Sequence, residues 1–122
     1  MGLFDVTQAA LERALVGSAL RHREIANNIA NANTPGFKRS DVDFASALAS
    51  ALAAARSPED IERLTFVPTV DGQSSARADG NNVDIDAEMA ALHENALTYQ
   101  ALALVAKARL RMLEIAIGGG RL

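Results

Sequence analysis

The chain has 122 residues, enough for one modest domain with a limited core of its own. Its formal net charge of -3 offers no basic surface of the kind that binds nucleic acid. Aromatic residues make up only 4% and alanine is abundant, which favours closely packed helices over a bulky core. Cysteine is absent, so neither a disulfide framework nor a thiolate site is available.

A long helix is predicted from about Phe4 to Asn31. Its apolar positions follow the alternating steps of four and three that form the contact row, or seam, of a coiled coil. The row consists of Leu11, Leu15, Ser18, His22, Ile25 and Ile29, of which Ser18 and His22 are polar interruptions. At about 1.5 Å per residue the helix spans about 40 Å. Part of its apolar face is therefore expected to find partners outside this short chain.

The helix is predicted to end within residues 25–39, which read I-A-N-N-I-A-N-A-N-T-P-G-F-K-R. Pro35 biases Thr34 away from the helical conformation. Pro35-Gly36 suits the two central positions of a type II turn, because glycine accepts the positive φ at the second of them. Side-chain amides surround this stop, from Asn27, Asn28, Asn31 and Asn33.

Short elements are predicted after the turn. The run Ser40-Asp41-Val42-Asp43 is expected to cap an alanine-rich helix over 44–55. Ser57 is expected to cap a second helical turn, with Pro58 at its first position, that continues through Ile61 to Leu64.

Residues 65–82 are expected to be extended and then irregular. The stretch 65–70 suits an edge strand, because Pro68 has no backbone N–H to donate to a ladder. Residues 71–82 are rich in Asp, Gly, Ser and Asn, and are predicted to form a mobile polar loop.

The clearest predicted element is a helix over 85–117. Its seam continues without a break through Ile85, Met89, Leu92, Ala96, Tyr99, Ala103, Ala106, Leu110, Leu113 and Ile117. Asp84 or Asp86 is expected to cap its start, and the glycines 118–120 are expected to stop it. A second apolar face lies off the seam, at Leu97, Leu102, Leu104 and Val105. A helix with two apolar faces is expected in a bundle or a polymer rather than in a simple dimer.

No catalytic, cofactor or metal site is predicted. His22 and His93 are single histidines without a carboxylate or cysteine at ligand spacing. The acidic run 79–88 has a calcium-loop composition, but Val83 stands where an oxygen ligand belongs and Asp84 where the turn glycine belongs. Phosphate loops, serine elbows and dinucleotide fingerprints are missing. We therefore expect that the chain is not an enzyme and needs no cofactor.

The sequence also predicts no direct membrane insertion. No segment approaches the roughly 18 to 20 consecutive apolar residues of a transmembrane helix. The start, residues 1–6, has no basic stretch before an apolar one, and Val6 stands where myristoylation requires Ser or Thr. A cytoplasmic location is thus expected, unless the chain is exported without a cleaved signal.

The run 25–39, which follows an amphipathic helix, resembles the N-terminal signature of the flagellar rod, hook and hook-associated proteins. Asn33 stands where that signature commonly has Asp, and Phe37 replaces a frequent Tyr. In this family the two terminal helices pair as a coiled coil in the inner layer of an axial tube. The resemblance implies a mainly α fold with one rod-type domain over 1–122. It is divided into an N-terminal helix (1–33), a short middle segment (34–84), a C-terminal helix (85–117) and a tail (118–122).

Within the family the chain is most similar to the proximal rod proteins, through the runs 40–44, 79–89 and 94–100 and its short middle segment. The resemblance implies a structural subunit of the proximal rod of the bacterial flagellar basal body, exported to the periplasm by the flagellar type III apparatus without a cleaved signal peptide. The implied partners are further copies of the chain, the proximal rod protein FlgC, the adaptor FliE and the export gate. Identity with FlgC itself is an alternative, although the C-terminal run differs from it.

The expected assembly interface combines residues of both seams with residues of the helix stop. They are Leu11, Leu15, Ile25, Asn27, Asn28, Ile29, Asn31, Asn33, Thr34, Pro35, Gly36, Phe37, Met89, Leu92, Ala96, Tyr99, Ala103, Ala106, Leu110, Leu113 and Ile117. An alternative is a soluble helical adaptor or export chaperone that holds a client with the same apolar faces. A peptidoglycan-cutting enzyme is a weaker alternative, because the chain has no room for such a domain.

Overall fold

A computed structural model describes residues 3–118. In chain order the elements are α1 (Leu3–Ala30), β1 (Ser40–Asp41), α2 (Phe44–Ala54), α3 (Pro58–Glu62), β2 (Thr69–Val70) and α4 (Ile85–Gly118). The fold is mainly α, as the sequence predicts. The expected helix stop at the glycines 118–120 falls only partly within the described residues, where α4 includes Gly118.

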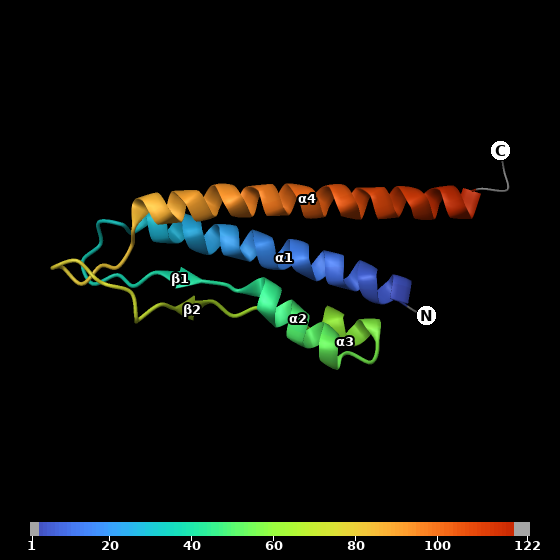
Figure 1. Cartoon of the computed structure of the whole chain (residues 1–122), viewed down its shortest axis with the longest axis horizontal. Coiled ribbons are helices and arrows are strands. Elements are labelled where there is room, and N and C mark those ends of the chain that lie inside the picture. Colours follow the sequence, from blue (N-terminus) through green and yellow to red (C-terminus); the bar gives the residue numbers. More distant parts are fainter. Residues whose placement is uncertain (1–2, 119–122) are drawn as a thin grey trace.

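The two long helices lie side by side and run in opposite directions (Figure 1). This confirms the predicted pairing of the terminal helices. Asp84 caps α4, because its carboxylate accepts a hydrogen bond from the backbone N–H of Ala87 at 3.2 Å. At its other end α4 runs on past the start of α1, so among residues 3–118 no other helix lies beside its last turns (Figure 1).

The face of α4 that α1 covers is not centred on the predicted seam. Its buried side chains are Glu88 and Asn95, which are 2% and 1% exposed. The seam residues Met89, Tyr99 and Leu110 remain 38–50% exposed. Hydrogen bonds explain this difference. Glu88 and Asn95 bond to partners on α1 and occupy the centre of the contact between the two helices, so the predicted seam lies towards the edge of that contact.

A smaller lobe, formed by α2 and α3, packs on the other side of α1 (Figure 1). Close approach is possible because Gly17 has no side chain: a Cβ there would lie 2.5 Å from the Cβ of Phe44. Phe44 in turn meets Phe66 edge to face, with ring centroids 6.4 Å apart. Ile61 of α3 is fully buried in this lobe.

The short elements differ in detail from the sequence predictions. Asp43 caps α2 as expected, because it accepts hydrogen bonds from the backbone and the hydroxyl of Ser46. Ser57 precedes Pro58 at the start of α3 but makes no capping bond with its side chain. Of the strand predicted over 65–70, only residues 69 and 70 pair with another strand; they form β2.

The partner of β2 is an element that the sequence analysis assigned to a helix cap. Ser40 pairs with Val70 and Asp41 with Thr69, in antiparallel register. Two residues on each side make a short ladder, too small to be read from a pattern of alternating polarity. The ladder joins the segment that follows α1 to the segment that leads back to α4.

We predict that Gly17→Leu separates α2 from α1 and lowers the free energy of unfolding by about 1–3 kcal/mol, because the added atoms overpack the contact with Phe44. The measurement is urea denaturation followed by circular dichroism. The matched control is Ala26→Leu, at an exposed position of the same helix, which should stay within about 0.5 kcal/mol of the wild type. Equal effects of both changes would contradict this packing.

Candidate assembly interface

The stop after α1 is the turn that the sequence predicts. Gly36 has a φ of 74°, and the carbonyl of Thr34 accepts a hydrogen bond from the N–H of Phe37 at 3.2 Å. The N–H of Gly36 donates to the carbonyl of Asp79 at 2.8 Å. A second glycine with positive φ, Gly80, lies against the turn, and a Cβ on it would be 3.3 Å from the Cα of Gly36. Two glycines therefore allow two chain segments to touch at the end of the molecule.

The segment before α4 caps the end of α1. The side chain of Asn81 donates hydrogen bonds to the carbonyls of Asn31 and Thr34, at 2.8 and 2.9 Å. The guanidinium of Arg77 donates to the carbonyl of Ala32. The carbonyls of Asn31 and Thr34 also accept backbone N–H groups, from Thr34 at 3.0 Å and from Phe37 at 3.2 Å, so Asn81 adds a second donor to each. The mobile loop predicted over 71–82 is therefore wrong at its end: Asn81 is fully buried and hydrogen-bonded, and Asn82 is 6% exposed.

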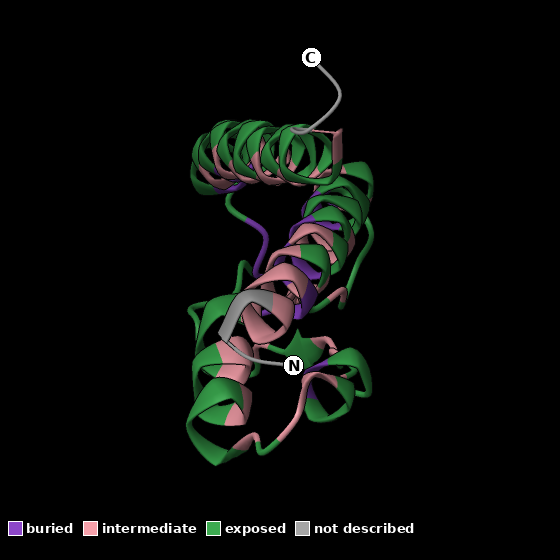
Figure 2. Ribbon diagram, turned by 90° about the vertical axis from the view of Figure 1, so that its right-hand side faces the viewer, coloured by how far each residue is buried: buried purple, intermediate pink, exposed green. Residues whose placement is uncertain are grey.

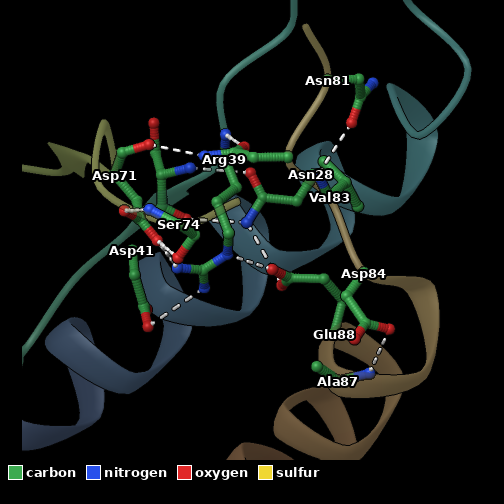
Figure 3. A network of polar contacts seen from close by, with 12 residues as sticks. Asn28, Arg39, Asp41, Asp71, Ser74, Asn81, Val83, Asp84, Ala87 and Glu88 are labelled. Atoms are coloured by element: carbon green, nitrogen blue, oxygen red, sulfur yellow. Dashed lines mark hydrogen bonds and ion pairs between the residues drawn. The ribbon is translucent and has the colours of Figure 1, made fainter. Parts of the chain in front are cut away.

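Next to this cap lies a network that we call the polar clasp, formed by Asn28, Arg39, Asp41, Asp71 and Glu88 (Figure 3). Asn28, fully buried near the end of α1, donates to the carbonyl of Ser40 at 2.7 Å and to Glu88 Oε2 at 3.2 Å. Its amide oxygen accepts from the N–H of Ser40 at 2.9 Å. One side chain thus joins α1, β1 and α4.

Arg39 is the cation of the clasp. Its Nε donates to Glu88 Oε1, and its Nη1 lies 3.2 Å from Asp71 Oδ2. Its Nη2 lies 3.6 Å from Asp41 Oδ2. Burial by itself would lower the pKa of Arg39, but the hydrogen bond and charge of Glu88, with the carboxylates of Asp71 and Asp41, raise it above its usual value. The guanidinium therefore stays charged.

The two aspartates that face Arg39 have pKa values below their ordinary value, which favours their ionised form. Partial burial would raise the pKa of Asp41, but hydrogen bonds from Arg21 and from the N–H of Val42 outweigh it, and the pKa is lowered. The pKa of Asp71 lies well below its usual range, first because the Ser74 hydroxyl donates to it at 2.6 Å and then because of backbone N–H groups.

A second buried polar contact lies farther along the helix pair. Asn95 of α4 donates to the carbonyl of Ser18 at 2.8 Å, and the Ser18 hydroxyl donates back to Asn95 Oδ1 at 3.2 Å. Ser18 is fully buried and Asn95 is 1% exposed. The serine that interrupts the predicted seam of α1 therefore has a polar partner on α4.

The outward face of α4 is exposed (Figure 2), and the large side chains along it are apolar. We call it the outer stripe: Leu97, Ala101, Leu104, Ala108, Met112 and Ile115, which recur at steps of three and four. Leu97 and Leu104 are each 68% exposed, and Met112 and Ile115 are 63% and 60% exposed. Such a continuous row of exposed apolar side chains is typical of a surface that another protein covers in an assembly.

Beside the outer stripe lies a hollow of about 300 Å³ between α1 and α4, which we call the interhelix groove. Its lining combines small residues with larger polar and aromatic ones: Ser18, Ala19, His22, Asn95, Ala96, Tyr99 and Gln100. The groove and the outer stripe face different directions around α4, because Ala96 and Leu97 are successive residues of one helix, about 100° apart.

The structure divides the residues of the expected assembly interface. Ile25 and Asn28 are fully buried within the chain. Those exposed at the turn are Asn33, Thr34, Pro35 and Gly36, and those exposed on helices are Asn27, Met89, Tyr99, Leu110 and Ile117. The others are half-buried: Leu11, Leu15, Ile29, Asn31, Phe37, Leu92, Ala96, Ala103, Ala106 and Leu113. The exposed and half-buried residues are available to a neighbour, whereas Ile25 and Asn28 act inside the subunit.

Sequence reasoning missed most of the polar clasp and part of the outer stripe. Arg39, Asp71 and Glu88 are far apart in the chain, and no local pattern links them. The outer stripe had a signal, since Leu97 and Leu104 stand off the seam at a spacing of seven. Extending that spacing through Ala101 and Ala108 would have found the complete row.

Residues 3–118 contain no group of three or more His, Cys, Asp or Glu side chains placed to hold a metal ion. Among the helices of this described part, none is long and apolar enough to cross a membrane.

We predict that Glu88→Gln lowers the free energy of unfolding by about 1.5–3 kcal/mol, because it removes the charge that Arg39 and Asn28 face in a buried site. Urea denaturation measures this. Glu94→Gln changes an exposed carboxylate of the same helix, and its effect should be within about 0.5 kcal/mol. A Glu88 variant as stable as the Glu94 variant would show that the clasp does not stabilise the fold.

We also predict that acid weakens the clasp. Because the pKa of Asp71 is lower in the folded chain than its ordinary value of about 3.9, its contribution to stability is complete well above pH 4 and is lost as the pH falls towards its folded value. Asp71→Asn should therefore show a smaller loss of melting temperature than the wild type between about pH 5 and pH 2. An unchanged acid profile would contradict the assignment.

Comparison with known proteins identifies the family. Residues 25–38 match the family model described as flagella basal body rod protein. The flagellar basal body rod protein FlgB of Bacillus subtilis is 34% identical over 131 aligned residues, which cover 99% of this chain and 100% of the relative. FlgB of Escherichia coli is 34% identical over 80% of this chain and 85% of its own length, and FlgB of Borrelia hermsii 34% over 81% and 86%. The chain belongs to the FlgB family of flagellar basal body rod proteins.

Proposed function

We propose that this rod protein is a subunit of the proximal rod, where it acts without catalysis and assembles with further copies of itself. The observation that carries the proposal is the exposed apolar surface of α4. Ten of its large apolar side chains are at least 38% exposed: Ile85, Met89, Leu97, Tyr99, Leu104, Val105, Leu110, Met112, Ile115 and Ile117. They surround the helix rather than forming one patch, so more than one neighbour is needed to cover them.

Assembly would supply the surface that a single chain lacks. At about 25 cal/mol per Å² of apolar surface removed from water, each covered leucine contributes about 1.5–3 kcal/mol to association. Among residues 3–118 no other helix lies beside the last turns of α4, so these turns gain most from a neighbour (Figure 1). Because α4 offers distinct surfaces on distinct sides, contacts between subunits can be heterologous, and such contacts produce helical filaments or tubes when they do not close into a ring.

The finer placement follows from the family. We infer that the neighbours include FlgC and the adaptor FliE at the base of the rod, and that the chain reaches the periplasm through the flagellar type III export gate without a cleaved signal. A chain that passes the gate unfolded has to refold outside. The absence of cysteine suits this route, because no disulfide has to form correctly during refolding.

Deletion of the gene tests the proposal. Basal bodies isolated from the deletion strain and viewed by electron microscopy should show membrane rings without a rod, and the wild-type gene should restore both the rod and swimming on soft agar. Intact rods in the deletion strain would overturn the proposal and favour a soluble adaptor or chaperone instead.

We predict that Leu104→Glu, in the outer stripe, fails to restore swimming to the deletion strain although the purified variant folds, because it places a charge on a surface that assembly has to bury. The matched control is Ala87→Glu, an exposed position of α4 outside the outer stripe, which should restore swimming. Circular dichroism of both variants checks that their helix content equals that of the wild type. Full swimming of Leu104→Glu would contradict a role of the outer stripe in assembly.

A further inference from the structure

We propose that the interhelix groove of one subunit receives the outer stripe of α4 from a second copy of the chain, with the two α4 helices running in the same direction. The inference rests on the proposed function and makes it specific. It names which surface of one copy meets which surface of the next. The occupant is a second copy because the same chain carries both complementary surfaces.

The groove has the shape to take a helix. Its lining includes Ser18, Ala19 and Ala96, whose small side chains let another helix approach closely. His22 and Tyr99 also line it, and the hollow holds about 300 Å³. That volume is ample for one leucine side chain together with the adjoining backbone of a neighbouring helix.

The outer stripe has a matching relief. Large and small residues alternate along it, with Leu97, Ala101, Leu104 and Ala108 at successive turns. Such alternation lets a leucine enter a hollow while the alanine beside it allows the two backbones to approach. In the proposed contact Leu97 enters the groove beside Ala96, and Leu104 lies two turns farther along the helix pair.

Charges beside the two surfaces are complementary and set the direction. Along α1, Arg23 is exposed one turn beyond Ala19 of the groove, and along α4 Glu114 stands beside Leu110 on the groove side. Flanking the outer stripe, Glu94 and Arg111 lie on opposite sides of it at about 100° per residue.

When the incoming α4 runs in the same direction as the resident α4, its Glu94 faces α1 near Arg23 and its Arg111 faces the resident α4 near Glu114. In the reverse direction Glu94 would face the resident α4 and Arg111 would face α1, so neither opposite-charge pair would form. The electrostatic arrangement therefore favours copies of one polarity.

The contact is heterologous. Each copy uses its outer stripe on one neighbour and its groove on another, so a pair still has one free surface of each kind. Addition can then continue, and every added copy points the same way, which a rod with distinct ends requires.

Single-cysteine variants test the contact directly, because the natural chain has no cysteine. Leu97→Cys marks the outer stripe and Ala19→Cys marks the groove. The two variants, carrying different tags, are expressed together in the deletion strain, and isolated basal bodies are treated with a short bismaleimide linker. The mixed pair should give a dimer bearing both tags, whereas neither variant alone should give a dimer.

A dimer of Leu97→Cys alone would mean that two outer stripes meet, and links only to another rod protein would mean that the occupant is not a second copy. Either result overturns the inference. If rods are present but the mixed pair is not linked, the inference fails while the proposed function stands. If the deletion strain has normal rods, the proposed function itself fails.

A charge exchange provides a second measurement. Glu94→Arg should reduce linking of the mixed pair, and adding Arg23→Glu to both variants should restore it. Loss in the single change without recovery in the double change would contradict the proposed direction of the helices.

Discussion

The fold depends on one buried carboxylate. Glu88 is 2% exposed, and a carboxylate in such a place is tolerated only when it is paired and hydrogen-bonded. Its partners come from both sides of the helix stop, since Asn28 precedes the turn and Arg39 follows it. Arg39 can reach Glu88 beside Asn28 only when the chain has turned at Gly36. The ion pair therefore couples the local conformation of the turn to the docking of α4.

A polar contact of this kind also determines how the two long helices are aligned. Alanine-rich surfaces slide past one another at little cost, because one small side chain resembles the next. Ser18 with Asn95, and Asn28 with Glu88, can be satisfied only in one relative position of α1 and α4. Buried polar residues at seam positions are known to specify register in coiled coils, at some cost in stability. Here two such contacts on one helix pair leave no freedom to shift.

Much of this architecture could be predicted from the sequence, and the part that could not has a physical reason. Local chemistry predicted both long helices, the turn at Pro35-Gly36, a cap within 40–43 and a cap at Asp84 or Asp86, because each depends on residues within a few positions of one another. The polar clasp joins residues that are up to tens of positions apart, so no short stretch of the sequence contains all of them. The covered face of α4 was also out of reach, because that helix is apolar on several sides and its pattern does not say which side stays inside.

The connectivity of the packing has a mechanical consequence. Among the helices of the described chain, α1 is in contact with α2, α3 and α4, whereas α4 packs on α1 alone. A force applied to the α2–α3 lobe therefore reaches α4 through the body of α1 and, at one end, through the ion pair of Arg39 with Glu88. In a rotating shaft built from such subunits, α1 would carry the shear force between the α2–α3 lobe and α4. The close contact between Gly17 of α1 and Phe44 of α2 would be the place where that force enters α1.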